Sequence, residues 1–160
     1  NSADATNTGG TNIKGLNYGE SGNAQMKFCG IEDFYGNVRN WIDGVYYDSS
    51  RNILTYDTES ESCVYNNTGS GYKTTITGLS ANVTGYSVAR QGTNDAGFCP
   101  KTGGGSAATY YCDHGYLGAS YAIGFGGAYS YTTNAGAFYL NGNAPANTSA
   151  NLGGRLAFCG

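Results

Sequence analysis

Few residues of this chain have the types and spacing that catalysis needs. His114 is the only histidine among 160 residues, and it directly follows Asp113. The pair could act as a general base or a metal-binding unit, but a base needs a nucleophile and an oxyanion site within hydrogen-bond reach, and no such motif lies nearby. We therefore expect a hydrogen-bonded structural histidine, and we predict no catalytic residue.

Three acidic residues, Glu32, Asp33 and Asp43, lie close together in the amino-terminal part of the chain. They could form a carboxylate pair or a cation site. A calcium site needs about six oxygen ligands from a compact set, and no loop here has that spacing. We expect these side chains to make capping and turn hydrogen bonds instead, and we predict no metal site.

The five cysteines are Cys29, Cys63, Cys99, Cys112 and Cys159. They lack the closely paired spacing of a zinc site. A glycine-rich turn could bring Cys99 and Cys112 together, although we slightly favour buried free thiols. With an odd number, at least one thiol stays free or pairs outside the chain. No cofactor is predicted.

Composition limits the classes of partner. The net charge is −3 and only 12% of the residues are charged, which argues against binding to nucleic acid or to an anionic membrane surface. No apolar run approaches the roughly 18 residues of a membrane span, so we predict no membrane insertion. The length fits a flexible lead over residues 1–10 followed by one domain over residues 11–160.

Short alternating segments predict a sheet-rich domain with many turns. Trp41, the only tryptophan, is expected to be largely buried in the core. One helical turn is predicted at residues 31–35, because Gly36 and Asn37 form a natural stop. The last predicted strand ends in a polar turn at His114. The predicted strands are residues 26–30, 38–47, 52–56, 72–76, 86–89 and 109–114.

The segment from residue 124 to residue 158 dominates the carboxy-terminal part. Residues 115–154 contain no Asp, Glu, Lys, Arg or His, so any surface that they present depends on Tyr, Asn, Ser, Thr and backbone groups. Such residues suit recognition, because Tyr offers a large, stiff contact area and Asn and Ser offer adaptable hydrogen bonds. An ordinary polar β region is the alternative. The apolar residues expected to anchor this segment are Phe138, Leu140, Leu152, Leu156 and Phe158.

Several blocks of this sequence resemble the C-type-lectin-like variable proteins that diversity-generating retroelements target, notably tail proteins of phages. The similarity runs from about residue 13 to residue 158. Its most specific parts are Gly36-Asn37-Val38 with Trp41, and the later blocks GGAYSY, NAGAFYL and NLGGRLAF. The core around Trp41 also resembles formylglycine-generating sulfatase-modifying enzymes, but the closely spaced cysteine pair of those enzymes is missing near the carboxyl end.

The resemblance implies an α+β, C-type-lectin-like fold of the formylglycine-generating-enzyme type. Such a fold has small twisted sheets, few helices and long structured loops, and its first and last strands lie together. It also implies that variable side chains project onto one solvent-facing patch, which Tyr121 could join. The implied ligand-binding set is Ala128, Tyr129, Tyr131, Thr133, Asn134, Tyr139, Asn141, Asn143, Asn147, Ser149 and Ala150.

The implied function is ligand or receptor binding without catalysis, at a phage tail tip or on a cell surface. The expected partner is a protein or glycan on a cell surface, and a homotrimer is compatible with the resemblance. In this family, mutation of adenines changes AAY codons, and the products include Asn, Tyr, Ser, Thr, Asp, Gly, Ala, Phe and Leu. Lys, Glu, Gln, Met and Trp are excluded from the products, and residues 115–154 contain none of these five residue types. The alternatives are a formylglycine-generating or degenerate sulfatase-modifying enzyme, and a purely structural tail module.

Overall fold

The computed structural model of this chain describes residues 11–19, 25–80, 83–94, 99–108, 111, 113–118 and 121–154. The predicted flexible lead and the anchors Leu156 and Phe158 lie outside these residues.

The described residues form short strands and one 3₁₀ helix, η1 (Tyr129–Asn134). Short strands follow from a sequence in which glycine and small polar residues interrupt every run of β-branched and aromatic residues. The strands are β1 (Lys27–Phe28), β2 (Ile31–Glu32), β3 (Arg39–Tyr47), β4 (Ile53–Thr55), β5 (Lys73–Ile76), β6 (Gly85–Gln91), β7 (Cys99–Gly103), β8 (His114–Tyr116), β9 (Tyr121–Phe125), β10 (Leu140–Asn143) and β11 (Leu152–Gly153).

Most strand predictions are confirmed within one to three residues. β1, β3, β4, β5 and β6 match the five segments that alternation indicated between residues 26 and 89. The predicted helical turn at residues 31–35 is wrong, because Ile31 and Glu32 pair with β1 in a small antiparallel hairpin. The predicted strand at 109–114 lies partly outside the described residues, and β8 begins at its last residue.

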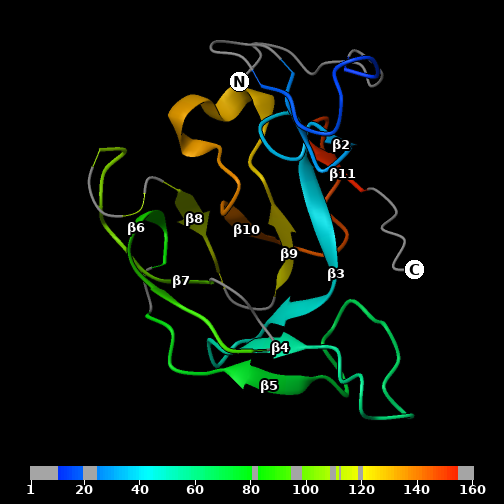
Figure 1. The fold of residues 1–160 in the computed structure, drawn as a ribbon. Helices are drawn as coiled ribbons and strands as arrows, with labels where there is room; N and C mark the ends of the chain where they lie inside the picture. The colour runs from blue at the N-terminus through cyan, green and yellow to red at the C-terminus, as the bar shows by residue number, and fades with distance from the viewer. Residues whose placement is uncertain are drawn as a thin grey trace.

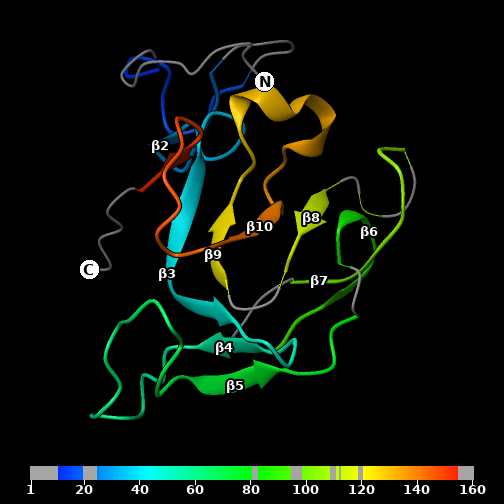
Figure 2. The ribbon, with the colours of Figure 1, turned by 180° about the vertical axis from the view of Figure 1, so that it is seen from behind.

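A nine-stranded sheet forms the body of the protein, with the order β5-β4-β3-β9-β10-β8-β6-β7 and with β11 on β3. It curls so that its two edges come together, as Figures 1 and 2 show from opposite sides. The backbone N–H of Ser80, after β5, donates to the carbonyl of Lys101 in β7 at 3.2 Å. The expected sheet-rich architecture with few helices is therefore confirmed.

The expected pairing of the first and last strands is not found among the described residues. β1 pairs with β2, whereas β11 runs parallel to β3 and places Leu152 opposite Arg39. This pairing brings the end of the described chain to the start of β3, where Arg39 lies.

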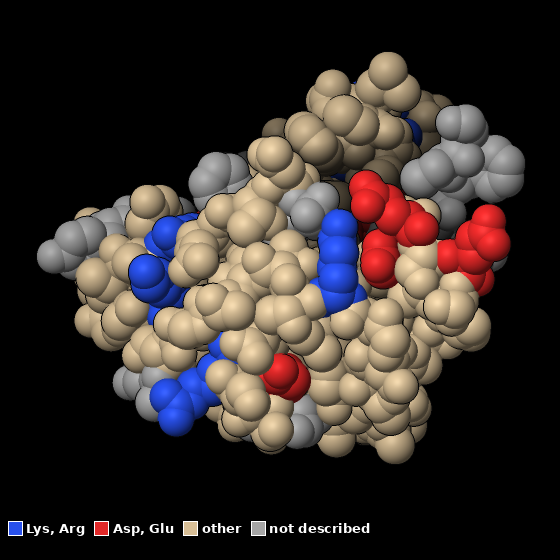
Figure 3. Space-filling view, turned by 90° about the horizontal axis from the view of Figure 1, so that it is seen from below, with Lys and Arg blue, Asp and Glu red and all other residues tan. Residues whose placement is uncertain are grey.

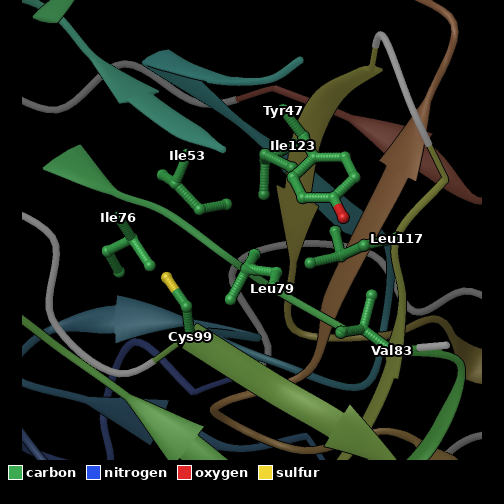
Figure 4. Close-up of a cluster of buried hydrophobic side chains, with 8 residues drawn as sticks. All are labelled: Tyr47, Ile53, Ile76, Leu79, Val83, Cys99, Leu117 and Ile123. Carbon is green, nitrogen blue, oxygen red and sulfur yellow. The ribbon is translucent and has the colours of Figure 1, made fainter. Parts of the chain in front are cut away.

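The apolar core lies inside the curled sheet. Side chains from β3, β4, β5, β7 and β9 point toward one another in Figure 4, joined by three residues from connecting segments. This arrangement removes large aliphatic groups from water, at about 25 cal/mol for each Å² of apolar surface. The cluster comprises Tyr47, Ile53, Ile76, Leu79, Val83, Cys99, Leu117 and Ile123.

The prediction that Trp41 is largely buried in the core is wrong, because its side chain is only half-buried. The pairing of β3 with β9 shifts register between Trp41 and Tyr46, which breaks the alternation that would have aimed Trp41 inward. Tyr47 enters the core instead, while Arg39 and Asn40 are buried at the other end of β3.

Asp33 and Asp43 make local hydrogen bonds, as predicted, whereas Glu32 bonds to Thr11, 21 residues earlier in the chain. Oε1 of Glu32 accepts the backbone N–H of Thr11 at 2.8 Å, and Oδ2 of Asp33 accepts Nδ2 of Asn37 at 3.0 Å. Asp43 accepts the N–H of Gly44 at 2.9 Å. These carboxylates stabilise turns around the β1–β2 hairpin and within β3.

Burial of the core predicts a clear contrast between two isoleucines. Ile76 is 1% exposed and Ile13 is 92% exposed. We expect Ile76→Ala to lower the free energy of unfolding by about 2 to 5 kcal/mol, the range for emptying an aliphatic core site. Ile13→Ala should change it by less than about 0.5 kcal/mol. Denaturant titration measures the free energy of unfolding of both variants. Equal losses in the two would show that Ile76 is not a core residue.

Candidate ligand-binding surface

Two segments that carry the predicted ligand-binding residues meet at Arg39. One is η1, which follows β9, and the other is the stretch after β10 that leads into β11. η1 has no buried residue and its chain kinks at Thr132, where φ is +46°. It therefore adds nothing to the apolar core, and it lies at one end of the molecule in Figures 1 and 2.

Arg39 is a buried cation held by neutral groups. Its side chain is 5% exposed, and its Nη1 donates to Oδ1 of Asn141 at 2.6 Å. Nη2 donates to Oδ1 of Asn151 at 2.7 Å, and the guanidinium carbon lies 5.4 Å from the ring centroid of Tyr131. Arg39 thereby joins β3 to η1, β10 and the segment before β11, all of which lie far from Arg39 in sequence.

A row of amide and hydroxyl groups extends from Arg39 toward solvent. Asn143 donates to Oδ1 of Asn141, and Asn147 donates to Oδ1 of Asn143 at 3.0 Å. Asn151, the second partner of Arg39, also accepts a hydrogen bond at its Oδ1 from the hydroxyl of Ser149, at 2.7 Å. These bonds hold the exposed residues of the second segment in place through the buried guanidinium.

Aromatic rings support η1 from below. Tyr139 is 3% exposed, and its ring centroid lies 5.6 Å from that of Tyr131 and 6.0 Å from that of His114. Tyr86 packs edge-on against His114 at 5.3 Å, and its hydroxyl donates to Oδ1 of Asn134 at 2.5 Å. Burial raises the pKa of Tyr139 to about 12, so its hydroxyl stays protonated at neutral pH.

His114 is a packed residue whose Nδ1 lacks the hydrogen bond that we predicted. This buried nitrogen has no partner among the described residues. Burial lowers the pKa of His114, because desolvation disfavours the charged imidazolium. The ring is thus held neutral between Tyr86 and Tyr139, as a structural part of the floor beneath η1.

The predicted ligand-binding residues divide into a buried group and an outer group. The buried ones are Ala128, Tyr139 and Asn141, at 0%, 3% and 5% exposure, so their predicted exposure is wrong. Ala128 lies beneath the start of η1, Tyr139 supports the ring stack and Asn141 is the partner of Arg39. The outer residues, which we call the outer set, are the half-buried Tyr129, Tyr131, Asn134 and Asn143 and the exposed Thr133, Asn147, Ser149 and Ala150. Tyr121, by contrast, is half-buried at the start of β9.

Phe138 was expected in the core and is instead 54% exposed. Gly136 packs so tightly against Asp113 that a Cβ would clash with the carboxylate Oδ1. The same Oδ1 accepts the backbone N–H of Phe138 at 3.2 Å. Next to this turn, Tyr139 is buried whereas Phe138 keeps more than half of its surface exposed.

Sequence analysis missed three contributors to this surface, Arg39, Tyr86 and Asn151. Tyr86 and Asn151 resemble many other residues of a Tyr- and Asn-rich chain, so nothing in the sequence singles them out. Arg39 carried one usable signal, since it follows Gly36-Asn37-Val38 at the start of a strand whose other residues are largely uncharged.

The segment that supplies the outer set differs in charge from the opposite end of the molecule. Figure 3 shows that opposite end, where most of the visible acidic side chains gather at one side and the basic ones lie near the centre and at the other side. The segment 115–154, which supplies the outer set, has no charged side chain. Ligand contacts at the outer set would therefore rely on aromatic faces, amides and hydroxyls.

The described thiols show no catalytic arrangement. Cys63 is buried and free, Cys29 is exposed and free, and burial raises the pKa of the Cys99 thiol to about 11. A pairing of Cys99 with Cys112 lies outside the described residues, as does Cys159. Within the described ranges, no three His, Cys, Asp or Glu residues group as metal ligands would. Among the residues that the structure describes, no helix is long and apolar enough to cross a membrane.

Comparison with protein families, curated protein sequences and solved structures gives no match for this chain.

The lowered pKa of His114 predicts a loss of stability in mild acid. Below about pH 6.5 the unfolded chain takes up a proton on this histidine that the folded chain resists, so the free energy of unfolding falls as the pH falls. His114→Phe keeps a ring between the two tyrosines and should remove this part of the pH dependence. Denaturant titrations between pH 7.5 and 5.5 measure it, and identical profiles for both proteins would contradict it.

Proposed function

We propose that this protein is a non-enzymatic binding domain that recognises a protein or glycan ligand through the outer set. In this proposal it is a C-type-lectin-like variable protein of a diversity-generating retroelement, acting at a phage tail tip or on a cell surface. The observation that carries the proposal is the separation between outer residues and the buried floor of Arg39, Tyr139 and Asn141.

This separation matters because a variable surface needs side chains that the fold does not depend on. Thr133, Asn147, Ser149 and Ala150 are exposed, and surface substitutions usually change stability by less than about 0.5 kcal/mol. The floor, in contrast, is held by charged hydrogen bonds and ring contacts. The exposed outer residues can thus be exchanged while the buried floor keeps its shape, whereas the half-buried Tyr131 and Asn143 contact that floor and tolerate fewer replacements.

The residue types of the outer set also suit the proposal. All eight are Tyr, Thr, Asn, Ser or Ala, and every one of these lies within the products expected from adenine mutation of AAY codons. Tyr129 and Tyr131 supply stiff aromatic contact area, while the amides and hydroxyls supply adaptable hydrogen bonds, which is the composition of many evolved binding sites.

The curled sheet with a single described 3₁₀ helix is compatible with the proposed fold. A surface of this size offers modest affinity at one site, because binding must first offset lost motional freedom. Display of several copies, as in a trimer at a tail tip, would raise the apparent affinity by roughly 10² or more.

A matched pair of libraries tests the proposal. The first diversifies the eight outer-set positions with AAY-type products. The second diversifies eight exposed positions in the loop between β4 and β5, at the opposite end of the molecule from η1 (Figures 1 and 2). These control positions are Thr58, Glu59, Glu61, Ser62, Val64, Asn67, Thr68 and Ser70.

Both libraries are displayed and selected against hen egg lysozyme as an arbitrary protein target. We expect most members of the first library to remain folded and some to bind, at a frequency at least tenfold above the control library. Unfolding of most outer-set variants would show that these residues belong to the scaffold. Equal numbers of binders from both libraries would remove the special role of this surface.

A further inference from the structure

A cavity of about 300 Å³ lies inside the curled sheet, beside the core cluster. Protein interiors are close-packed and contain few spaces larger than a water molecule, so a space of this size in a 160-residue chain requires an explanation. Five strands and the turn before β10 surround it. The lining residues are Ile42, Val45, Ile53, Thr55, Cys99, Ile123, Phe125, Ala137, Phe138 and Leu140.

The curl of the sheet creates this space. Curved sheets of about eight strands enclose an interior that side chains just fill or that holds one small ligand. Here β3, β4, β9 and β10 all turn aliphatic or aromatic side chains toward the cavity, and β7 contributes Cys99. The cavity is thus a product of the fold and lies on its concave side.

Phe138 marks the point where the cavity reaches the surface. It lines the cavity and is 54% exposed, which is unusual for an aromatic residue next to a core. Its backbone is fixed on both sides, because the N–H donates to Oδ1 of Asp113 and the carbonyl accepts Nη1 of Arg90, each at 3.2 Å. The backbone of Phe138 is therefore held in place, and Phe138 is the one exposed residue of the lining.

The lining is apolar and uncharged. Eight of the ten residues carry only hydrocarbon side chains. The hydroxyl of Thr55 already shares a hydrogen bond of 2.6 Å with Thr75, and burial raises the pKa of Cys99 to about 11, which keeps its thiol neutral. A charged group beside the lining is Arg90, whose guanidinium carbon lies 5.9 Å from the centroid of the Phe138 ring. A cationic ligand group would therefore find nothing in the described lining to compensate for the water that it loses.

We propose that this cavity binds a small, uncharged, apolar molecule, which enters beside Phe138. An engineered apolar cavity of about 150 Å³ binds benzene, so twice that volume accommodates roughly ten to twelve carbon atoms. A bicyclic aromatic or a compact aliphatic of that size fits both the volume and the lining. The site is independent of the proposed surface function, since none of its residues belongs to the outer set.

Naphthalene, an uncharged hydrocarbon of ten carbons, is the probe. We expect a saturable titration of the Ile42, Ile123 and Leu140 methyl signals in the NMR spectrum of the full chain. The cationic analogue 1-naphthylmethylammonium, which the nearby Arg90 guanidinium would repel, should leave these signals in place. If naphthalene causes no shift up to its solubility limit, or shifts only signals around η1, the proposal is wrong.

A substitution that fills the cavity provides the matched control. Ala137→Phe adds a ring at the lining, whereas Ala150→Phe adds the same ring at an exposed position. We expect the first to weaken naphthalene binding at least tenfold and the second to leave it unchanged. Equal binding by both variants would overturn the proposal.

Xenon binding to the unaltered chain tests the cavity even if the Ala137→Phe variant does not fold. Crystals of the unaltered chain under xenon pressure should show the gas between Ile42, Ile123 and Leu140. A crystal in which xenon occupies other sites but leaves this space empty would also overturn the proposal.

Discussion

The surface around η1 depends on one buried guanidinium. Arg39 is removed from water, and moving a cation into a protein interior costs several kcal/mol unless hydrogen bonds replace its hydration. Asn141 and Asn151 supply two of those bonds, and the Tyr131 ring covers the charge. Because the fork of Arg is rigid, the partners are fixed in direction as well as distance. Three segments without a shared apolar core are thereby held together.

This arrangement explains how a largely irregular, charge-free stretch has a defined shape. Hydrogen bonds to a charged group contribute about 1.5 to 3 kcal/mol each, which is large beside the effects of exposed side chains. The order of η1 and of residues 143–151 follows from contacts beneath them, so their outward-facing side chains are left available for recognition. The apolar cavity lies inside the curl, and β3 and β10 each supply residues both to the cavity and to the network around Arg39.

The sequence predicted the strands better than the surface. Alternation and turn residues located β3 to β6, because those signals are local. Burial within the Tyr- and Asn-rich part was harder to predict, since Asn141 in the floor and Asn147 at the surface are the same residue type. Only the pairing of β10 between β9 and β8 separates them. Trp41 and Phe138 were misplaced for a similar reason, because a register shift and a tight Gly136 turn reorient side chains without a signature in composition.

Hydrogen exchange of the Arg39→Lys variant tests the central role of this guanidinium most directly. Lysine keeps the positive charge but lacks the planar guanidinium that binds two acceptors in a fixed geometry. Arg51→Lys, at an exposed arginine, is the control. We predict faster exchange in peptides covering residues 128–154, unchanged exchange in peptides covering β4 and β5, and no change anywhere in the control. Unchanged exchange over residues 128–154, or an equal increase across the whole chain, would contradict a role of Arg39 specific to this surface.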